Sequence, residues 1–280
     1  FLWGIGMTIS NKIAIGCLIQ WYEIEIIEEY LQSVKNAVDL IDNKENVVID
    51  LYFNCSQELE KVDEEQITMS DIKKRYDDLL EDMFGDLDYG GYNVNSYINE
   101  FSNVMYTIAN YRRDFNNKYC TEGDVLMWGE SDSLIPRQTF QILDNLQTAV
   151  KEKTPKYVTF FGTCKMWDDS WLPVEHTEFT DKPFVDGDTE NWWSLRYNMT
   201  IDEMNKFNDK VEHLDIKPIH QYKLNGCGLV MSSDVVKAGV NIPNSSFFIH
   251  EDTAFMLQLQ KMFQGVIPQY VIKNILLVHN

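Results

Sequence analysis

Two nearly continuous apolar segments, separated by an amphipathic one, constrain the fold of this chain more than any other feature. The apolar segments, Lys12–Trp21 and Asn46–Phe53, are typical of strands that are buried on both faces. Between them, Glu25–Leu40 carries apolar residues at helical spacing, among them Leu31 and Val34. A strand, a helix and a second strand in this order build a parallel sheet. The sequence therefore predicts an α/β fold.

The rest of the chain continues to alternate between helical and strand-like periodicity. Helices are predicted over residues 69–83, 94–115, 137–150, 200–211, 232–236 and 251–263. Strands are predicted over residues 124–129, 157–163, 226–231 and 266–278. Thr200, followed by Glu203, predicts a capping box at the start of one helix. The sequence shows neither an internal repeat nor a low-complexity linker, which favours one domain.

The charge of the chain bears on its partners. It has 24 Lys and Arg against 44 Asp and Glu, a net charge of −20. Nucleic-acid binding depends on clustered basic side chains that meet phosphates. The clusters here are short, at residues 73–75 and at Arg112 and Arg113. A DNA or RNA partner is therefore disfavoured.

Cysteine content and hydropathy bear on location. The five cysteines are widely spaced and form no C-x-x-C pair, which argues against a zinc knuckle or a redox motif and favours free thiols in a reducing compartment. No apolar stretch approaches the roughly 18 residues that span a bilayer. We therefore expect a cytoplasmic protein without a transmembrane segment. Residues 1–11 are interpreted as an N-terminal extension or a remnant of cloning.

The most informative motif is an apolar run, Val125–Trp128, that leads directly into Glu130, Ser131 and Asp132. A strand that places paired acids at its carboxyl end is suited to holding Mg²⁺ or Mn²⁺ against a diphosphate, because these cations prefer oxygen ligands. An isolated acid-x-acid triplet can equally be two solvated acids in a turn. The remaining motifs decide between these alternatives.

Five short motifs occur in a fixed order along the chain. They are Phe53-Asn-Cys-Ser-Gln-Glu, Arg112-Arg113-Asp114, the segment 123–136, Gly226-Cys-Gly-Leu-Val-Met and His250-Glu-Asp-Thr. In this order the chain, over residues 12–280, resembles nucleotide-sugar glycosyltransferases of the GT-A fold. The pattern is family 2-like, closest to the inverting family that includes cellulose and hyaluronan synthases. The sequence departs from that pattern at Asn54, Cys55, Asp114 and Glu130.

The resemblance implies a GT-A, Rossmann-like single domain with a mostly parallel central sheet flanked by helices. Residues 12–150 would form the half that binds the nucleotide sugar, and residues 151–280 the half that binds the acceptor. The donor would be a UDP-sugar or another NDP-sugar. A bound Mn²⁺ or Mg²⁺ would neutralise the departing diphosphate.

The resemblance also implies roles for the acids and the late histidine. Asp132 would ligate the metal, and His279 would be a second ligand, although a frayed terminal histidine is the alternative. Glu130 would bind ribose hydroxyls or a metal-bound water, and Ser131, between the two acids, would also bind the donor. Asp252 would be the general base, with Glu251 supporting it. Acids in the first turn of a helix are also favoured by the helix dipole alone.

Further residues are candidates for binding the donor. Arg112 or Arg113 would contact the diphosphate, unless they only pair with Asp114. Trp21 would stack on the nucleobase or lie in the core, and Asn54 occupies the turn that faces the base. The tryptophans within residues 167–193 would shape the acceptor pocket or merely anchor their loop; they are Trp167, Trp171, Trp192 and Trp193.

The sequence thus predicts a metal-dependent glycosyltransferase that moves a sugar to an acceptor hydroxyl, most simply that of a saccharide, with inversion. One alternative is a phage-type glycosyltransferase that acts on hydroxymethylated DNA bases, because the composition is typical of AT-rich genomes. The other alternative is a catalytically silent GT-A scaffold that binds a nucleotide sugar or a protein partner.

Overall fold

The predicted strand–helix–strand opening is confirmed. A computed structural model of the chain describes residues 6–55, 68–85, 91–100, 105–163, 199–219, 226–246, 250–262 and 266–279. In it, β1 (Ile13–Gln20) is followed by α1 (Ile27–Val38) and β2 (Val47–Asn54). β1 and β2 are parallel and in register from Ile13 against Val47 to Gln20 against Asn54. Every residue of β1 except Gln20 is buried, as its continuous apolar sequence requires.

Further strands extend this pair into a sheet that has nine strands among the described residues. They are β3 (Asn93–Asn99), β4 (Val125–Trp128), β5 (Ser133–Leu134), β6 (Val158–Thr163), β7 (Ile216–Ile219), β8 (Val230–Ser232) and β9 (Gln269–His279). The order is β3-β2-β1-β4-β8-β6-β9-β5, and β7 also pairs with β9. β3, β2, β1 and β4 are mutually parallel, as are β6 and β9, whereas β8 lies antiparallel to both of its neighbours. The predicted mostly parallel sheet is confirmed.

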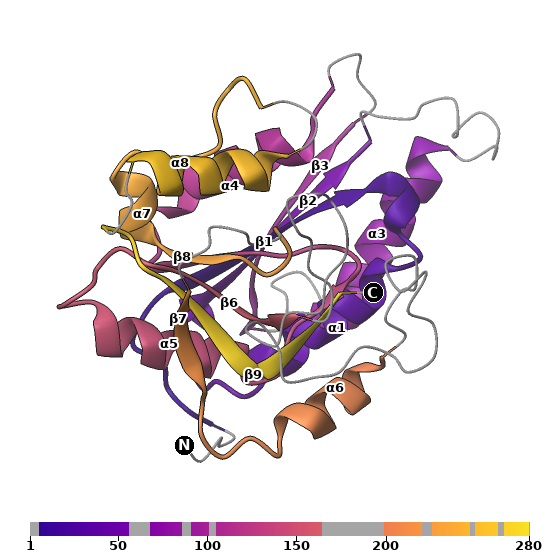
Figure 1. Ribbon diagram of the computed structural model, residues 1–280. Helices are drawn as coiled ribbons and strands as arrows, with labels where there is room; N and C mark the ends of the chain where they lie inside the picture. The colour runs from indigo at the N-terminus through magenta and orange to yellow at the C-terminus, as the bar shows by residue number, and fades with distance from the viewer. Residues whose placement is uncertain are drawn as a thin grey trace, which may run out of the picture.

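Helices cover both faces of the sheet (Figure 1). One core joins the sheet to α1, α3 (Met69–Phe84) and α5 (Thr139–Val150). A second core lies on the other face, under α4 (Ile108–Tyr119), α7 (Ser233–Lys237) and α8 (Glu251–Met262). α6 (Ile201–Asn208) packs through Met204 against Leu276 of β9. Burying both faces explains why the inner strands are apolar along their whole length.

The prediction of one helix over residues 94–115 is wrong at its beginning. Residues 93–99 form β3, which pairs in parallel with β2 along its whole length. The helix begins only at Ile108, after a capping box between Thr107 and Asn110. β3 has few apolar residues because it is the outer strand of the sheet and most of its side chains are at least partly exposed. Its identity as a strand therefore depends on pairing rather than on periodicity.

Several other local predictions have clear outcomes. The predicted capping box is confirmed, because Glu203 N donates to Thr200 Oγ1 and Thr200 N donates to Glu203 Oε2. The strand predicted over 226–231 begins only at Val230, and the short strands β5 and β7 were not predicted. The four tryptophans between Trp167 and Trp193 lie outside the described residues. In the described part of the chain, no helix combines the length and the hydropathy needed to cross a membrane.

Candidate active site

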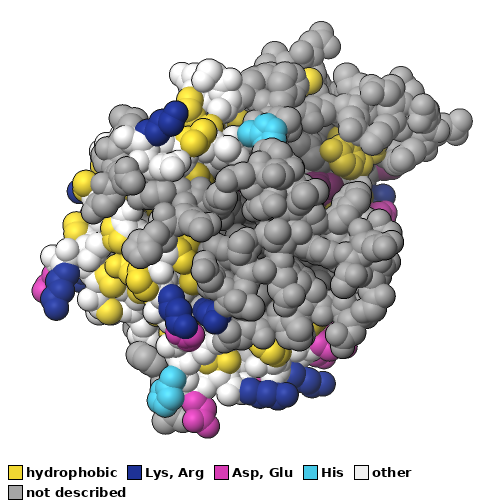
Figure 2. Space-filling view, in the orientation of Figure 1, with side chains coloured by type: hydrophobic (Ala, Val, Ile, Leu, Met, Phe, Trp, Pro, Cys, Tyr) yellow, Lys and Arg dark blue, Asp and Glu magenta, His cyan; other side chains and the backbone are white. Residues whose placement is uncertain are grey.

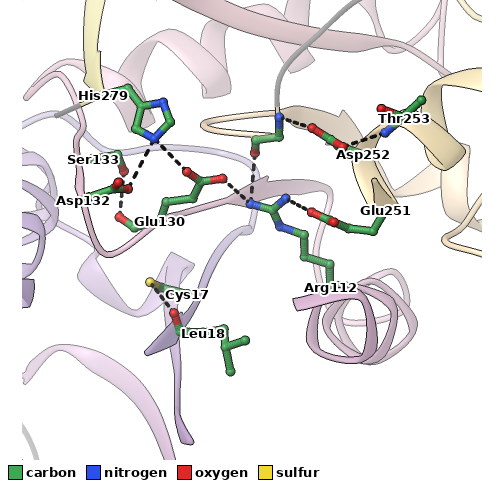
Figure 3. A network of polar contacts seen from close by, with 11 residues as sticks. Cys17, Leu18, Arg112, Glu130, Asp132, Ser133, Glu251, Asp252, Thr253 and His279 are labelled. Atoms are coloured by element: carbon green, nitrogen blue, oxygen red, sulfur yellow. Dashed lines mark hydrogen bonds and ion pairs between the residues drawn. The ribbon is translucent and has the colours of Figure 1, made fainter. Parts of the chain in front are cut away.

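The acidic motif lies where β4 ends and the chain turns into β5. Gly129 follows β4, and Glu130, Ser131 and Asp132 form the turn. β5 then pairs antiparallel with the end of β9, which places Ser133 opposite His279. This pairing brings the histidine to the acids: its Nε2 lies 3.1 Å from Glu130 Oε2 and 3.4 Å from Asp132 Oδ1 (Figure 3).

The charges of this group depend on one another. Burial alone would lower the pKa of His279, but its hydrogen bonds and ion pairs with Asp132 and Glu130 outweigh burial and raise the pKa to about 10. Burial alone would raise the pKa of Glu130, but His279 and Arg112 outweigh it and lower the pKa to about 2. The proton of His279 and the negative charge of Glu130 therefore stabilise each other.

A buried arginine joins the acidic turn to α8. The Nη2 atom of Arg112 lies 2.7 Å from Glu130 Oε1, and its Nη1 atom lies 2.6 Å from Glu251 Oε1. The Arg112 side chain is only 2% exposed, and its guanidinium lies 4.7 Å from the centre of the Trp128 ring. Gly226 leaves room for it, because a Cβ there would come within 2.3 Å of Nη1. Its hydrogen bonds to Glu130 and Glu251 make Arg112 a structural link in this state.

The two acids at the start of α8 have different surroundings. Glu251 is buried against Arg112, and burial raises its pKa although Arg112 opposes the shift. Asp252 is half-buried and accepts hydrogen bonds from Gly226 N at 3.0 Å and from Thr253 N at 2.7 Å. Gly226 also accepts from Arg112 through its carbonyl oxygen, so one peptide segment connects Asp252 to the acidic turn (Figure 3). Of the two acids, Asp252 is the more exposed.

Three predicted donor-binding residues lie apart from this network and hold structure together. Asn54 is buried and donates to Gln20 Oε1 and to the Tyr106 carbonyl, which ties the ends of neighbouring strands. Trp21 lies in the core at 2% exposure. Arg113 donates to the Pro243 carbonyl at 3.0 Å. Their contact with a donor stays a prediction.

Ser131 lies between the two acids of the turn and is buried. Its hydroxyl makes a hydrogen bond with Glu23. Burial raises the pKa of Glu23, and that hydrogen bond partly opposes the rise. Ser131 therefore connects the acidic turn to the end of β1. This contact of Glu23 was not predicted.

Sequence reasoning also missed Cys227. Ligand atoms of Cys227, Glu130 and His279 all lie within 4.8 Å of one another. The only sequence feature that pointed to Cys227 is its position between two glycines, Gly226 and Gly228. That pattern predicts only a glycine-rich strand. Its place beside the acids depends on contacts between distant segments.

One face of the molecule shows how the described charged side chains are distributed. In Figure 2, the described Lys and Arg side chains form small separate groups with Asp and Glu among them. On the face shown, the described basic residues form no continuous strip of the kind that follows a nucleic-acid backbone.

Comparisons with known proteins identify the fold. No protein-family model matches the chain, and no curated protein sequence matches it. Among solved structures, S. aureus TarS 1–349 aligns with a TM-score of 0.51 and 13% identity, over 94% of this chain and 60% of that one. A longer structure of S. aureus TarS has a TM-score of 0.50 and 13% identity, over 94% of this chain and 36% of that one. This chain thus spans about 60% of the shorter TarS structure. The likeness shows the fold, and this chain has a GT-A fold.

Proposed function

We propose that this protein is a metal-dependent glycosyltransferase that moves a sugar from a nucleoside-diphosphate sugar to an acceptor hydroxyl, with inversion at the sugar. The observation that carries the proposal is the meeting of Glu130, Asp132 and His279 at the carboxyl ends of β4 and β9. In open α/β sheets, ligands bind outside the carboxyl ends of the strands. The fold supports the same class of reaction but does not by itself establish it.

The residues at this end of the sheet fit a divalent cation. Asp132 and Glu130 offer carboxylate oxygens, and His279 offers Nε2, a donor set that suits Mn²⁺. Arg112 occupies only Oε1 of Glu130, and Oε2 faces His279. When bound, the cation would act as a Lewis acid that stabilises the charge of the departing diphosphate. His279 would then bind as the neutral imidazole, and its proton would be released.

Asp252 is the proposed general base. Its carboxylate is held by two backbone N–H donors, Gly226 N and Thr253 N, and it remains partly open to solvent. A carboxylate oriented in this way can accept the proton of an acceptor hydroxyl as that hydroxyl attacks the sugar. Arg112 and Glu251 would act as positioning residues, because their ion pair fixes α8 relative to the acidic turn.

Each of the two predicted halves of the domain would contribute residues to the active site. The segment 12–150 supplies Arg112 and the acidic turn, and the segment 151–280 supplies Asp252 and His279. We propose that the first half binds the donor and the second the acceptor. A saccharide acceptor is favoured over DNA because the described basic side chains form no strip on the face in Figure 2 and the net charge is −20.

A binding and turnover experiment tests the proposal. UDP-, GDP- and dTDP-sugars are screened by thermal shift with and without Mn²⁺, and hydrolysis of any stabilising donor is then measured. We expect one donor class to raise the melting temperature only with metal, because a ligand of the native state stabilises it by mass action.

Asp132→Asn is compared with Asp234→Asn, a change at an exposed acid of α7. Removing a residue that only supports a metal ligand typically reduces activity about 10–100-fold. Asp132 is proposed as a ligand itself, so we expect Asp132→Asn to reduce metal-dependent hydrolysis at least about 100-fold. Unchanged turnover in Asp132→Asn would show that the site is assigned incorrectly. Donor binding without any turnover in the unsubstituted protein would favour a silent scaffold.

A further inference from the structure

Cys227 is a buried thiol at the edge of the proposed metal site. It is 2% exposed and lies in the segment Gly226–Gly228 that leads into β8. A ligand atom from each of Cys227, Glu130 and His279 lies within 4.8 Å of the other two. A carboxylate, a thiol and an imidazole converge there, and all three are types of side chain that bind metal ions.

The backbone around Cys227 is fixed on both sides. Gly228 N donates to the Trp128 carbonyl at 3.0 Å, and Trp128 N donates to the Leu229 carbonyl at 2.9 Å. Gly228 has a φ of +71°, and a Cβ there would come within 2.5 Å of Leu277 Cδ1 in β9. The segment is therefore held between β4, which ends at the acids, and β9, which ends at His279. The approach of the thiol to these residues follows from backbone packing rather than from a mobile side chain.

We propose that Cys227 is a ligand of the metal centre together with Glu130 and His279, and that the centre prefers thiophilic divalent cations such as Zn²⁺ and Co²⁺ to Mg²⁺. The inference rests on the proposed function in that it concerns the same site. It changes the chemical class of the cation, because thiolate and imidazole ligands select zinc-like metals, whereas all-oxygen sites suit magnesium.

The three ligand atoms are close enough to meet at one ion after a limited contraction. Zinc sites are tetrahedral, with bonds of about 2.3 Å to sulfur and about 2.0–2.2 Å to nitrogen and oxygen, so two ligand atoms of one ion lie roughly 3.3–3.7 Å apart. From separations of up to 4.8 Å, the ligand atoms would approach one another by at most about 1.5 Å. As the metal–sulfur bond forms, the thiol gives its proton to the buffer, so that the ligand is the thiolate.

Cys227 could instead serve only as an apolar residue of the core, in the hydrophobic cluster that also includes Val230 and Leu277. A spectroscopic test separates the two roles. Co²⁺ is titrated into the full chain without donor, and the near-ultraviolet thiolate-to-cobalt charge-transfer band is recorded. We expect the band in the unsubstituted protein, its loss in Cys227→Ser, and its retention in Cys17→Ser, which alters another fully buried thiol of the same core. Zn²⁺ should displace Co²⁺, and excess Mg²⁺ should not.

Two results would overturn the inference. One is Co²⁺ binding, detected by calorimetry, without a charge-transfer band. The other is a band that survives Cys227→Ser. Neither result affects the proposed function, which fails if donor turnover is absent or proves independent of metal. The proposed function and the proposed role of Cys227 can therefore be disproved independently.

A second measurement covers the case in which Cys227→Ser does not fold. Each of the other four cysteines is then replaced singly by serine. We expect the band to persist in all four variants, which leaves Cys227 as its source, and loss of the band in any one of them would contradict the inference.

Discussion

Arg112 and Glu251 form an ion pair that is withdrawn from water: Arg112 Nη1 lies 2.6 Å from Glu251 Oε1, and the side chains are 2% and 8% exposed. The same guanidinium bonds Glu130, so α4, the acidic turn and α8 meet at one cation. A buried charge is tolerated only when it is paired. The pair therefore connects the stability of the fold with the geometry of the candidate site.

Removing Arg112 should destabilise the protein strongly. Arg112→Met would leave Glu251 without this cation and Glu130 with His279 alone. Breaking a buried ion pair in this way costs about 3–5 kcal/mol. Urea unfolding followed by circular dichroism would measure the free energy of unfolding. Arg113→Met is the matched control, because the side chain of this half-buried neighbour donates to a neutral acceptor, the Pro243 carbonyl. Equal losses in the two variants would show that the ion pair contributes little.

Replacing Asp252 by Asn should remove catalysis while leaving donor binding intact. Asn has the same size as Asp, and its one amide oxygen can still accept from Thr253 N or from Gly226 N, which bind different oxygens of Asp252. The amide cannot act as a base. General base catalysis typically contributes about 10²–10⁴-fold, so we expect a loss of that size in single-turnover transfer. Donor affinity, measured by calorimetry, should remain unchanged. Asp202→Asn, at the first turn of α6, is the control, and transfer as slow in that variant would contradict the role of Asp252.

The stability of the metal-free protein should decrease as pH rises above neutrality. The pKa of His279 is raised from 6.5 to about 10 by Asp132 and Glu130, against the effect of burial. The folded state thus holds this proton more tightly than the unfolded state. The resulting stabilisation is fully present below about pH 6.5 and is lost between pH 6.5 and 10.

Urea unfolding in the presence of a chelator, at a series of pH values, measures this dependence. His279→Gln cannot titrate, so its profile should be flatter over the same range. Parallel profiles for the two proteins would show that His279 does not hold its proton as described.

The hydroxyl of Tyr30 should be dispensable. It is buried and makes no hydrogen bond with the residues that the structure describes. An unsatisfied buried polar group costs about 1–3 kcal/mol, so Tyr30→Phe should leave the free energy of unfolding unchanged or raise it. Tyr111→Phe is the contrasting variant, because its hydroxyl donates to Asp50 Oδ1 at 2.7 Å, and it should lose about 1–3 kcal/mol. A loss in Tyr30→Phe as large as in Tyr111→Phe would indicate a hydrogen-bond partner for Tyr30.

The sequence by itself determined the elements that local burial controls. The apolar segments 12–21 and 46–53 become β1 and β2, and the motif ending at Asp132 lies at the end of β4. These predictions succeed because a strand that is buried on both faces must be apolar along its whole length. The capping box at Thr200 succeeds for a similar reason, since its hydrogen bonds join residues three apart.

The tertiary structure alone decided which distant side chains meet. Pairing of β5 with β9 sets His279 beside Asp132, and packing of Gly228 between β4 and β9 sets Cys227 beside Glu130. Residues 93–99 form a strand because they pair in parallel with β2, whose edge is otherwise unpaired on that side among the described strands. Such contacts join segments that are far apart along the chain, whereas periodicity reports only how each segment is buried. Which residues form the site therefore could not be predicted without the strand order of the sheet.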